Sequence, residues 1–291
     1  MAAAPSILNR RGRRTSVAAA APVRQAGQVE VLLLGTGAAD GIPNPFCECA
    51  TCADYRRRGQ LRTPTSILID ARLLVDPGPE SPRQVSRLGR DLLGCRVILA
   101  GHAHSDHLDP SVLMHRSWVT DAGLDVLGPA PVIAASRQWL DPQQEAVRFV
   151  TLTSGDRVNC AGYDIEALSA NHDAYGEALC YRIDDGSASL LYLTDTGPLP
   201  EQTLAAVTGR RVDLVLLEET FGYATKSGRH HDLPAFAATV AALRANGTVD
   251  ECTRIVPIHL GHDNPPLAVL TEEMAALGAE VLADGDVITL G

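Results

Sequence analysis

The sequence predicts an α/β protein in which a mixed β-sheet is sandwiched between helices. Apolar runs of strand length alternate with amphipathic stretches of helical length along the 291-residue chain. Many of the expected strands also follow one another in hairpin-like succession, which favours a mixed sheet over a purely parallel one. Histidine or aspartate follows several strands directly, so we expect a metal site at one edge of the sheet.

The folded part of the chain is expected over residues 29–291. Residues 1–28 are rich in alanine and arginine and show no hydrophobic periodicity, so we interpret them as a disordered tail. An export signal is the alternative, prompted by Arg13 and Arg14 ahead of a short apolar run. Pro22 interrupts that run, and this favours the tail.

Each expected element is an apolar or amphipathic run bounded by turn residues. The expected strands are 29–34, 66–70, 73–76, 95–100, 132–134, 147–152, 163–169, 178–183, 189–194, 212–217, 254–258 and 287–290. A turn at Ala71-Arg72 joins the second and third strands as a hairpin. The expected helices are 82–90, 110–118, 233–246 and 266–277, and Asp232 is suited to be the N-cap of the third.

The charge and the apolar runs of the chain argue against two classes of partner. The net charge is −10, and because residues 1–28 contain five arginines and no acid, the remainder carries −15. A nucleic-acid-binding face would need a basic stripe, and no apolar run is long enough to cross a membrane. We expect a small anionic substrate, because bound metal ions would reverse the charge locally. A homodimer is the one protein association that we consider.

Seven residues, Gly101-His102-Ala103-His104-Ser105-Asp106-His107, form the centre of the predicted site. Neutral imidazole and carboxylate are ligands that Zn²⁺ and Mn²⁺ accept. His102 and His104 share one side of this short turn, whereas Asp106 and His107 point to a neighbouring position. The spacing therefore predicts two adjacent metal ions. The alternative, a histidine-rich surface loop, does not account for the other histidines of the chain.

Further metal-binding residue types follow other strands. His172 follows strand 163–169, Asp195 follows strand 189–194, and His259 follows strand 254–258. All three could converge on one rim of the sheet. Asp76 ends the hairpin, where its carboxylate could accept a hydrogen bond from the metal-binding turn and orient it.

Three of the seven cysteines, Cys47, Cys49 and Cys52, lie within six residues. Closely spaced thiolates indicate a structural zinc whose fourth ligand, a cysteine or histidine, comes from elsewhere in the chain. Reduced thiols or a redox pair are the alternatives. An odd number of cysteines does not suggest a disulfide framework, and zinc thiolates need a reducing compartment. We therefore expect a cytoplasmic protein.

The turn His102-x-His104-x-Asp106-His107, with the later His172, Asp195 and His259, resembles the metallo-β-lactamase superfamily. The resemblance implies an αβ/βα four-layer sandwich with a dinuclear site at one edge. Gly35-Thr36-Gly37, the cysteine triplet and Ile258-His259-x-x-His262 are similar to one branch of it. That branch contains the phosphoribosyl 1,2-cyclic phosphate phosphodiesterase of the carbon–phosphorus lyase pathway.

The resemblance also implies the roles of individual residues. One divalent ion, Mn²⁺ or Zn²⁺, would be held by His102, His104 and His172. The second would be held by Asp106, His107 and His259, with Asp195 bridging both ions. A structural Zn²⁺ would be held by Cys47, Cys49, Cys52 and His262.

The branch has a proton-donating histidine before an Asp-Leu pair. Here both His230 and His231 precede Asp232-Leu233, and alignment on that pair favours His230. The other interpretation of His231 is a surface residue at the start of a helix. Asp106 and His230 are thus the residues to which the resemblance gives a catalytic role. The sequence departs from the branch at Gly101, where threonine is commoner, and over residues 218–222.

The function that follows is hydrolysis of a small, cyclic phosphate diester. Two ions about 3.5–4 Å apart lower the pKa of a bridging water and clamp the attacking and leaving oxygens, while an imidazolium protonates the leaving group. The same centre could open a lactone or an ester. An iron-dependent oxidative enzyme of cofactor biosynthesis, similar to the pyrroloquinoline-quinone B protein, is the alternative from another class. A tRNA-processing nuclease and a non-catalytic scaffold are less favoured, because the chain lacks a basic arm and no ligand is missing.

Overall fold

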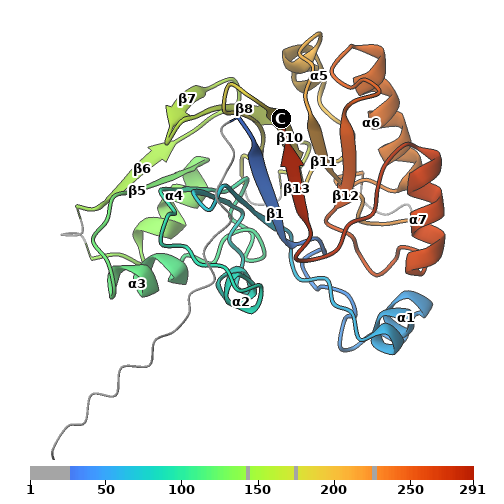
Figure 1. Ribbon diagram of the computed structural model, residues 1–291, viewed down its shortest axis with the longest axis horizontal. Helices are drawn as coiled ribbons and strands as arrows, with labels where there is room; N and C mark the ends of the chain where they lie inside the picture. Colours follow the sequence, from blue (N-terminus) through green and yellow to red (C-terminus); the bar gives the residue numbers. More distant parts are fainter. Residues whose placement is uncertain (1–26, 142–144, 174–175, 225–227) are drawn as a thin grey trace, which may run out of the picture.

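Two β-sheets packed face to face form the centre of the molecule, and helices cover their outer faces (Figure 1). This computed structural model describes residues 27–141, 145–173, 176–224 and 228–291. Residues 1–26 of the predicted tail lie outside the described residues, so the tail stays a prediction. The layers run helix, sheet, sheet, helix, which confirms the four-layer α/β sandwich.

The first sheet has seven strands. In spatial order they are β13 (Val287–Leu290), β1 (Val29–Gly35), β2 (Ser66–Ile69), β3 (Leu73–Val75), β4 (Val97–Leu99), β5 (Leu124–Gly128) and β6 (Val147–Thr151). Antiparallel pairing joins β13, β1, β2 and β3. The predicted hairpin between β2 and β3 is present, and its turn begins one residue earlier than predicted, with Asp70 and Ala71 at its centre. From β3 to β6 the pairing is parallel. The carboxyl ends of β3 and β4 therefore meet at the same edge.

The second sheet has six strands. In spatial order they are β12 (Arg254–Ile258), β11 (Leu214–Glu218), β10 (Ser189–Leu193), β9 (Leu179–Asp184), β8 (Tyr163–Ser169) and β7 (Arg157–Cys160). The strands β10, β11 and β12 are parallel, whereas β7 to β10 pair in antiparallel fashion. Two successive antiparallel pairings make β8 run in the same direction as β10. Four strands of this sheet, β8, β10, β11 and β12, thus end at one edge.

Seven helices complete the described fold. They are α1 (Ala50–Arg58), α2 (Ser81–Arg87), α3 (Ser111–Ser117), α4 (Ala130–Arg137), α5 (Glu201–Val207), α6 (Leu233–Ala245) and α7 (Leu267–Ala276). Apolar side chains of α2, α3 and α4 pack on the outer face of the first sheet, and those of α5, α6 and α7 on the second. Helix α1 lies beside α7 (Figure 1). Among the described residues, we find no helix with the length and apolar character needed to span a bilayer.

Three apolar clusters hold these layers together. The central one joins the inner faces of the two sheets, where Tyr181 and Tyr192 are among the largest fully buried side chains. The start of α6 follows the predicted pattern, because the Asp232 side chain accepts a hydrogen bond from the Ala235 backbone N–H at 2.9 Å. Burial of these alternating apolar faces is the main force that holds the sandwich together.

One predicted strand is wrong. Residues 132–134 lie in α4, not in a strand, and their apolar side chains Val132 and Ile133 are buried against the first sheet. A short apolar run does not distinguish strand from buried helix by periodicity. Pro131 decides the outcome, because a proline in the first turn has its backbone angle already set for a helix. Elements α1, α5, β5 and β7 have no counterpart among the predictions.

Candidate metal centre

The predicted ligands all follow strands that end at the same edge of the sandwich. The turn 102–107 follows β4 of the first sheet, and the other three ligands follow β8, β10 and β12 of the second sheet. These three are His172, Asp195 and His259. Parallel alignment of strand ends is thus the reason why residues up to 157 positions apart in sequence share one rim.

The first group of ligand atoms belongs to His102, His104, His172 and Asp195, which lie within 4.8 Å of one another. His102 Nε2 is 2.7 Å from His104 Nδ1 and 3.1 Å from Asp195 Oδ2. His172 Nε2 is 3.4 Å from His104 Nδ1. Three imidazoles and one carboxylate oxygen thus face a common point.

The second group of ligand atoms belongs to Asp106, His107, His259 and again Asp195. Asp106 Oδ2 lies 2.9 Å from His107 Nε2. Asp195 Oδ2 lies 3.3 Å from His107 Nε2, and Asp195 Oδ1 lies 2.9 Å from His259 Nε2. Asp195 is the one residue present in both groups, and its carboxylate lies between them.

The donor set fits two divalent cations. His107 Nε2, His259 Nε2 and Asp195 Oδ1 are buried without a hydrogen-bond partner among the described residues, although His259 Nε2 lies 2.9 Å from Asp195 Oδ1 and His107 Nε2 lies 3.3 Å from Asp195 Oδ2. A buried polar atom left unsatisfied costs about 1–3 kcal/mol. Cations between these atoms would satisfy all of them, and imidazole nitrogen with carboxylate oxygen is a donor set that Zn²⁺ and Mn²⁺ accept.

Burial and neighbouring charges set the protonation states in this centre. Burial lowers the pKa of His102, and it lowers the pKa of His172 to about 4, so both imidazoles are neutral near pH 7. Burial opposes the charge on His259, but the Asp195 carboxylate outweighs it and raises the pKa of His259 to about 10. Burial likewise opposes the charge on Asp195, and the imidazoles of His259 and His107 outweigh it and hold its pKa well below its usual range. Binding of a cation beside His259 would therefore release a proton.

Asp76 orients the turn 102–107, as its position after the hairpin suggested. It is fully buried, and its Oδ2 accepts a hydrogen bond from His107 Nδ1 at 2.7 Å. Its Oδ1 accepts a hydrogen bond from the Gly101 backbone N–H at 2.8 Å, and Tyr192 donates to Oδ2 at 3.0 Å. With Nδ1 of His107 donating to Asp76, Nε2 is the atom that faces the centre.

Three residues of the centre have a left-handed backbone. The φ angles of Asp76, Asp195 and His259 are 50°, 47° and 54°, a region that costs a residue with a β-carbon roughly 1–3 kcal/mol. Asp76 and His259 lie directly after a strand, and Asp195 lies two residues after the end of β10. This conformation turns the chain sharply there and directs the side chain to the rim.

Gly101, which stands where threonine is commoner in the similar branch, is explained by a close backbone contact. A β-carbon at this position would lie 2.7 Å from the carbonyl oxygen of Leu179. The same two residues are joined by a hydrogen bond from the Leu179 N–H to the Gly101 carbonyl at 2.9 Å. The two sheets thus approach each other through their backbones at this point, and only glycine fits.

The two adjacent histidines differ sharply. His230 is partly buried, and its ring lies 4.9 Å from that of His172 and 5.5 Å from that of His259. His231 is fully buried, so its interpretation as a surface residue is wrong. Its Nδ1 donates to the Thr196 carbonyl at 2.8 Å and its Nε2 accepts from the Thr239 hydroxyl at 2.8 Å. Both nitrogens of His231 are therefore engaged in holding the start of α6 against the loop after β10.

Glu218 belongs to the site, although the residue-by-residue reasoning on the sequence did not select it. Its Oε2 accepts hydrogen bonds from His230 Nδ1 at 2.8 Å and from the Thr220 hydroxyl at 2.5 Å. Thr220 in turn contacts His259 Nδ1 at 2.9 Å. Burial opposes ionisation of Glu218, but the hydrogen bond from His230 and the nearby imidazole of His231, at 3.8 Å, outweigh it and lower its pKa to about 2. The signal was present in the sequence, since Glu218 ends a buried strand at the same edge as Asp195.

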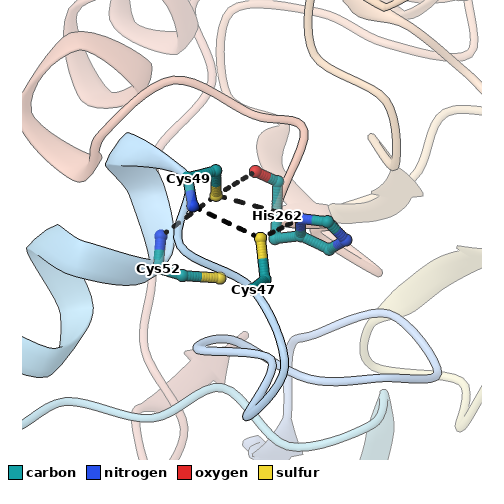
Figure 2. A group of neighbouring side chains, drawn as sticks. All are labelled: Cys47, Cys49, Cys52 and His262. Carbon is teal, nitrogen blue, oxygen red and sulfur yellow. Dashed lines mark hydrogen bonds between the residues drawn. The ribbon is translucent and has the colours of Figure 1, made fainter.

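A separate cluster contains Cys47, Cys49, Cys52 and His262, whose ligand atoms lie within 4.8 Å of one another (Figure 2). His262 Nδ1 is 3.3 Å from the Cys47 sulfur and 3.8 Å from the Cys49 sulfur. Its Nε2 lies 3.3 Å from Asp40 Oδ2, which orients the ring. Three sulfurs and one imidazole nitrogen are a donor set typical of structural zinc sites.

The thiols of this cluster differ in acidity. Burial opposes ionisation of Cys49, but hydrogen bonds from the Cys52 N–H and from His262 outweigh it and lower its pKa to about 7. Burial raises the pKa of Cys52 to about 12. A zinc ion would have to displace the proton of Cys52, so its affinity for the cluster should increase with pH.

Comparison with known proteins identifies the family of the chain and supports its fold. Residues 71–260 match the sequence profile of the beta-lactamase superfamily domain. The fold is similar to that of a diphosphatase of the PhnP family (TM-score 0.71, 19% identity, 90% of this chain and 98% of the other). It is equally similar to zinc-bound PqqB of Methylobacterium extorquens (TM-score 0.71, 20% identity, 90% of this chain and 99% of the other).

A curated relative covers a shorter part of the chain. The octanoyltransferase of Porphyromonas gingivalis is 38% identical over 105 residues, which are 33% of this chain and 21% of that protein. The chain thus spans about a fifth of the length of this relative.

Proposed function

The chain belongs to the beta-lactamase superfamily, and we propose that it is a dinuclear metal-dependent hydrolase of small phosphate diesters. The observation that supports this most directly is Asp195, whose carboxylate lies between the two groups of ligand atoms: Oδ2 is 3.1 Å from His102 Nε2 and 3.3 Å from His107 Nε2, and Oδ1 is 2.9 Å from His259 Nε2. A carboxylate shared in this way suits a pair of cations held side by side.

The proposed ligand assignment follows the two groups of donor atoms. His102, His104 and His172 would hold one ion, and Asp106, His107 and His259 the other, with Asp195 between them. Bound divalent ions supply Lewis acidity and lower the pKa of water, which is the chemistry that hydrolysis of a diester requires. Asp76 keeps Nε2 of His107 directed to its ion, and Thr220 does the same for His259.

His230 is the proposed proton donor to the leaving oxygen. Its Nδ1 is bonded to Glu218, so Nε2 is the atom left to carry a transferable proton. Its ring lies beside His172 and His259, one ligand of each proposed ion. His231 is unsuited to the role because both of its nitrogens are engaged. A histidine in this position also favours hydrolysis over other reactions, because the alkoxide that leaves in hydrolysis needs a proton.

The proposed substrate is a small anion bound by the cations, and the similar fold of the PhnP-family diphosphatase supports the phosphate ester class. The net charge of −10 argues against a polyanion such as nucleic acid. Cys47, Cys49, Cys52 and His262 are proposed to hold a structural zinc, which in turn favours a reducing compartment such as the cytoplasm.

An oxidative enzyme of cofactor biosynthesis is the second candidate, because the fold is as similar to PqqB as to the diphosphatase. Metal content separates the two. Iron in the purified protein and turnover that depends on oxygen would favour the second candidate. Zinc or manganese with hydrolysis under anaerobic conditions would favour the first.

The test combines elemental analysis with a panel of cyclic phosphates, linear phosphate diesters and lactones. We expect two divalent ions and one further zinc per chain, and hydrolysis of a phosphate diester. Asp195→Asn should lose at least one ion and nearly all turnover while it remains folded, because asparagine tolerates the left-handed backbone at this position. His115→Ala, in α3 and outside the centre, is the matched control. Full metal content and activity in Asp195→Asn would refute the proposal.

A further inference from the structure

A second cavity lies on the outer face of the first sheet and shares no lining residue with the metal centre. Its volume is about 410 Å³, in the range of pockets that hold small molecules. Leu74 of β3, Ile98 of β4 and Leu124 of β5 form a buried apolar floor. Residues of α3 and of the loop before β4 form its walls.

The walls of this cavity expose apolar side chains to solvent. Leu93 is 84% exposed and Val119 is 83% exposed, and both line the cavity. Trp118, 70% exposed, packs its ring at 5.1 Å from that of His115, which is another lining residue. Large apolar side chains around a concave apolar surface are typical of a binding site.

Positive charge gathers at the same cavity. Arg96 and Arg116 line it together with His115, and its fourteen lining residues include no aspartate or glutamate. Arg96 Nη1 donates to the carbonyls of Leu93 and Cys95 at 3.2 and 2.9 Å, and Arg116 Nη2 donates to the Ala122 carbonyl.

Among the described residues, neither guanidinium forms an ion pair with a carboxylate. The ion pairs of other arginines, such as Arg90, Arg148 and Arg229, do not involve Arg96 or Arg116. Burial lowers the pKa of Arg116, and repulsion from Arg96 lowers it further. An arginine has five N–H donors, so these backbone contacts leave several donors of each guanidinium for a ligand. The cavity thus combines an apolar floor with two uncompensated cations.

We propose that this cavity binds a medium-chain fatty acid or a similar unbranched monocarboxylate. The alkyl chain lies on Leu74, Ile98 and Leu124, and the carboxylate accepts hydrogen bonds from Arg96 and Arg116. Arginine recognises carboxylates through paired N–H groups, and such charge-assisted bonds are the strong ones. This site is independent of the proposed hydrolase activity, because it uses no residue of the metal centre.

Calorimetric titration of the metal-loaded full chain with hexanoate, octanoate and decanoate tests the proposal. Affinity should increase about fourfold for each added methylene, the gain expected for one buried CH₂ group. Octylamine, which has the same tail and a cationic head, should not bind. The fluorescence of Trp118 at the rim should change in parallel with the heat.

Variants locate the binding. Arg96→Gln and Arg116→Gln should each weaken octanoate binding about tenfold or more, and should leave binding of the uncharged octanol unchanged. Arg83→Gln on α2, an exposed arginine outside the cavity, is the matched control. Ala122→Trp should fill the cavity and abolish binding of both. Circular dichroism checks that each variant is folded, and Arg96, which is exposed, is the safer of the two substitutions.

Several results would overturn the proposal. The proposal would be refuted if octanoate did not bind, or if octylamine bound with the same affinity as octanoate. Octanoate binding that is lost in Asp195→Asn but unchanged in Arg96→Gln would place the carboxylate at the metal centre instead. Self-association that Ala122→Trp abolishes, without octanoate binding, would assign the cavity to a second copy of the chain.

Discussion

Two adjacent histidines with the same chemistry have opposite environments, and a single-residue experiment can separate them. We expect His230→Ala to keep both proposed ions and to lose turnover by about 10²- to 10⁴-fold, because a proton donor is removed. The loss should shrink for nitrophenyl esters, whose leaving group departs without a proton. Steady-state rates on matched alkyl and nitrophenyl substrates measure this difference.

The control for this prediction is His231→Ala. Its two hydrogen bonds to Thr196 and Thr239 are buried, so the variant should lose about 1–3 kcal/mol of unfolding free energy without a dependence on the leaving group. Glu218→Gln should show a weaker form of the His230→Ala phenotype, because Glu218 accepts the hydrogen bond that positions His230. An equal loss on both substrate types in His230→Ala would contradict its role as donor.

At the scale of elements, one short segment after β12 serves both candidate metal sites. His259 belongs to the dinuclear centre and His262, three residues later, to the cysteine cluster. The Ala38 N–H donates to the Leu260 carbonyl at 2.9 Å, and the Leu260 N–H donates to the Thr36 carbonyl at 3.0 Å. The loop that carries the cysteines is thus tied to the segment that carries His259. A zinc at the cluster would clamp α1 and the end of β12 together.

Replacing Cys49 by serine tests this clamp. We expect Cys49→Ser to lose one zinc per chain and to melt at a lower temperature, because structural zinc contributes folding free energy directly. Turnover should fall as well, since His259 would lose a neighbouring anchor. Elemental analysis and thermal unfolding measure the two effects. Cys252→Ser, at an exposed cysteine outside the cluster, should change neither, and unchanged zinc in Cys49→Ser would refute the assignment.

At the scale of the whole molecule, the candidate metal centre joins the two sheets. The turn 102–107 belongs to the first sheet, and His172, Asp195 and His259 belong to the second. Ions bound there would therefore act as a crosslink between the halves of the sandwich. Without them, His107 Nε2, His259 Nε2 and Asp195 Oδ1 remain buried and unsatisfied.

Chelation should consequently destabilise the protein. A ligand present at a hundred times its dissociation constant stabilises the folded state by about 2.7 kcal/mol, so removal of the ions should lower the melting temperature by several degrees. Differential scanning calorimetry with and without a chelator measures the shift. Repeating it with Cys49→Ser separates the dinuclear centre from the cysteine cluster. If the shift disappears entirely in Cys49→Ser, the dinuclear ions do not crosslink the sheets.

The sequence by itself determined the features that depend on local pattern. Strand-length apolar runs located β4, β8, β10 and β12, and the histidines and the aspartate that follow these strands pointed to one rim because parallel strands end together. The orienting role of Asp76 was inferred from its place after a hairpin. The structural zinc site was inferred from the close spacing of Cys47, Cys49 and Cys52, because zinc needs such a donor set.

Only the tertiary structure decided the features that depend on what packs against a residue. His231 is a core residue because the loop after β10 and α6 close around it, and Glu218 enters the site because β11 lies between β10 and β12. Residues 132–134 are helical because α4 packs on the first sheet, and Gly101 is needed where the backbone of Leu179 approaches. The local sequence pattern shows the hydrophobic periodicity of an element and the residue types at its ends. The contacts described here join residues that are distant in sequence, so they depend on the packing of the complete sandwich.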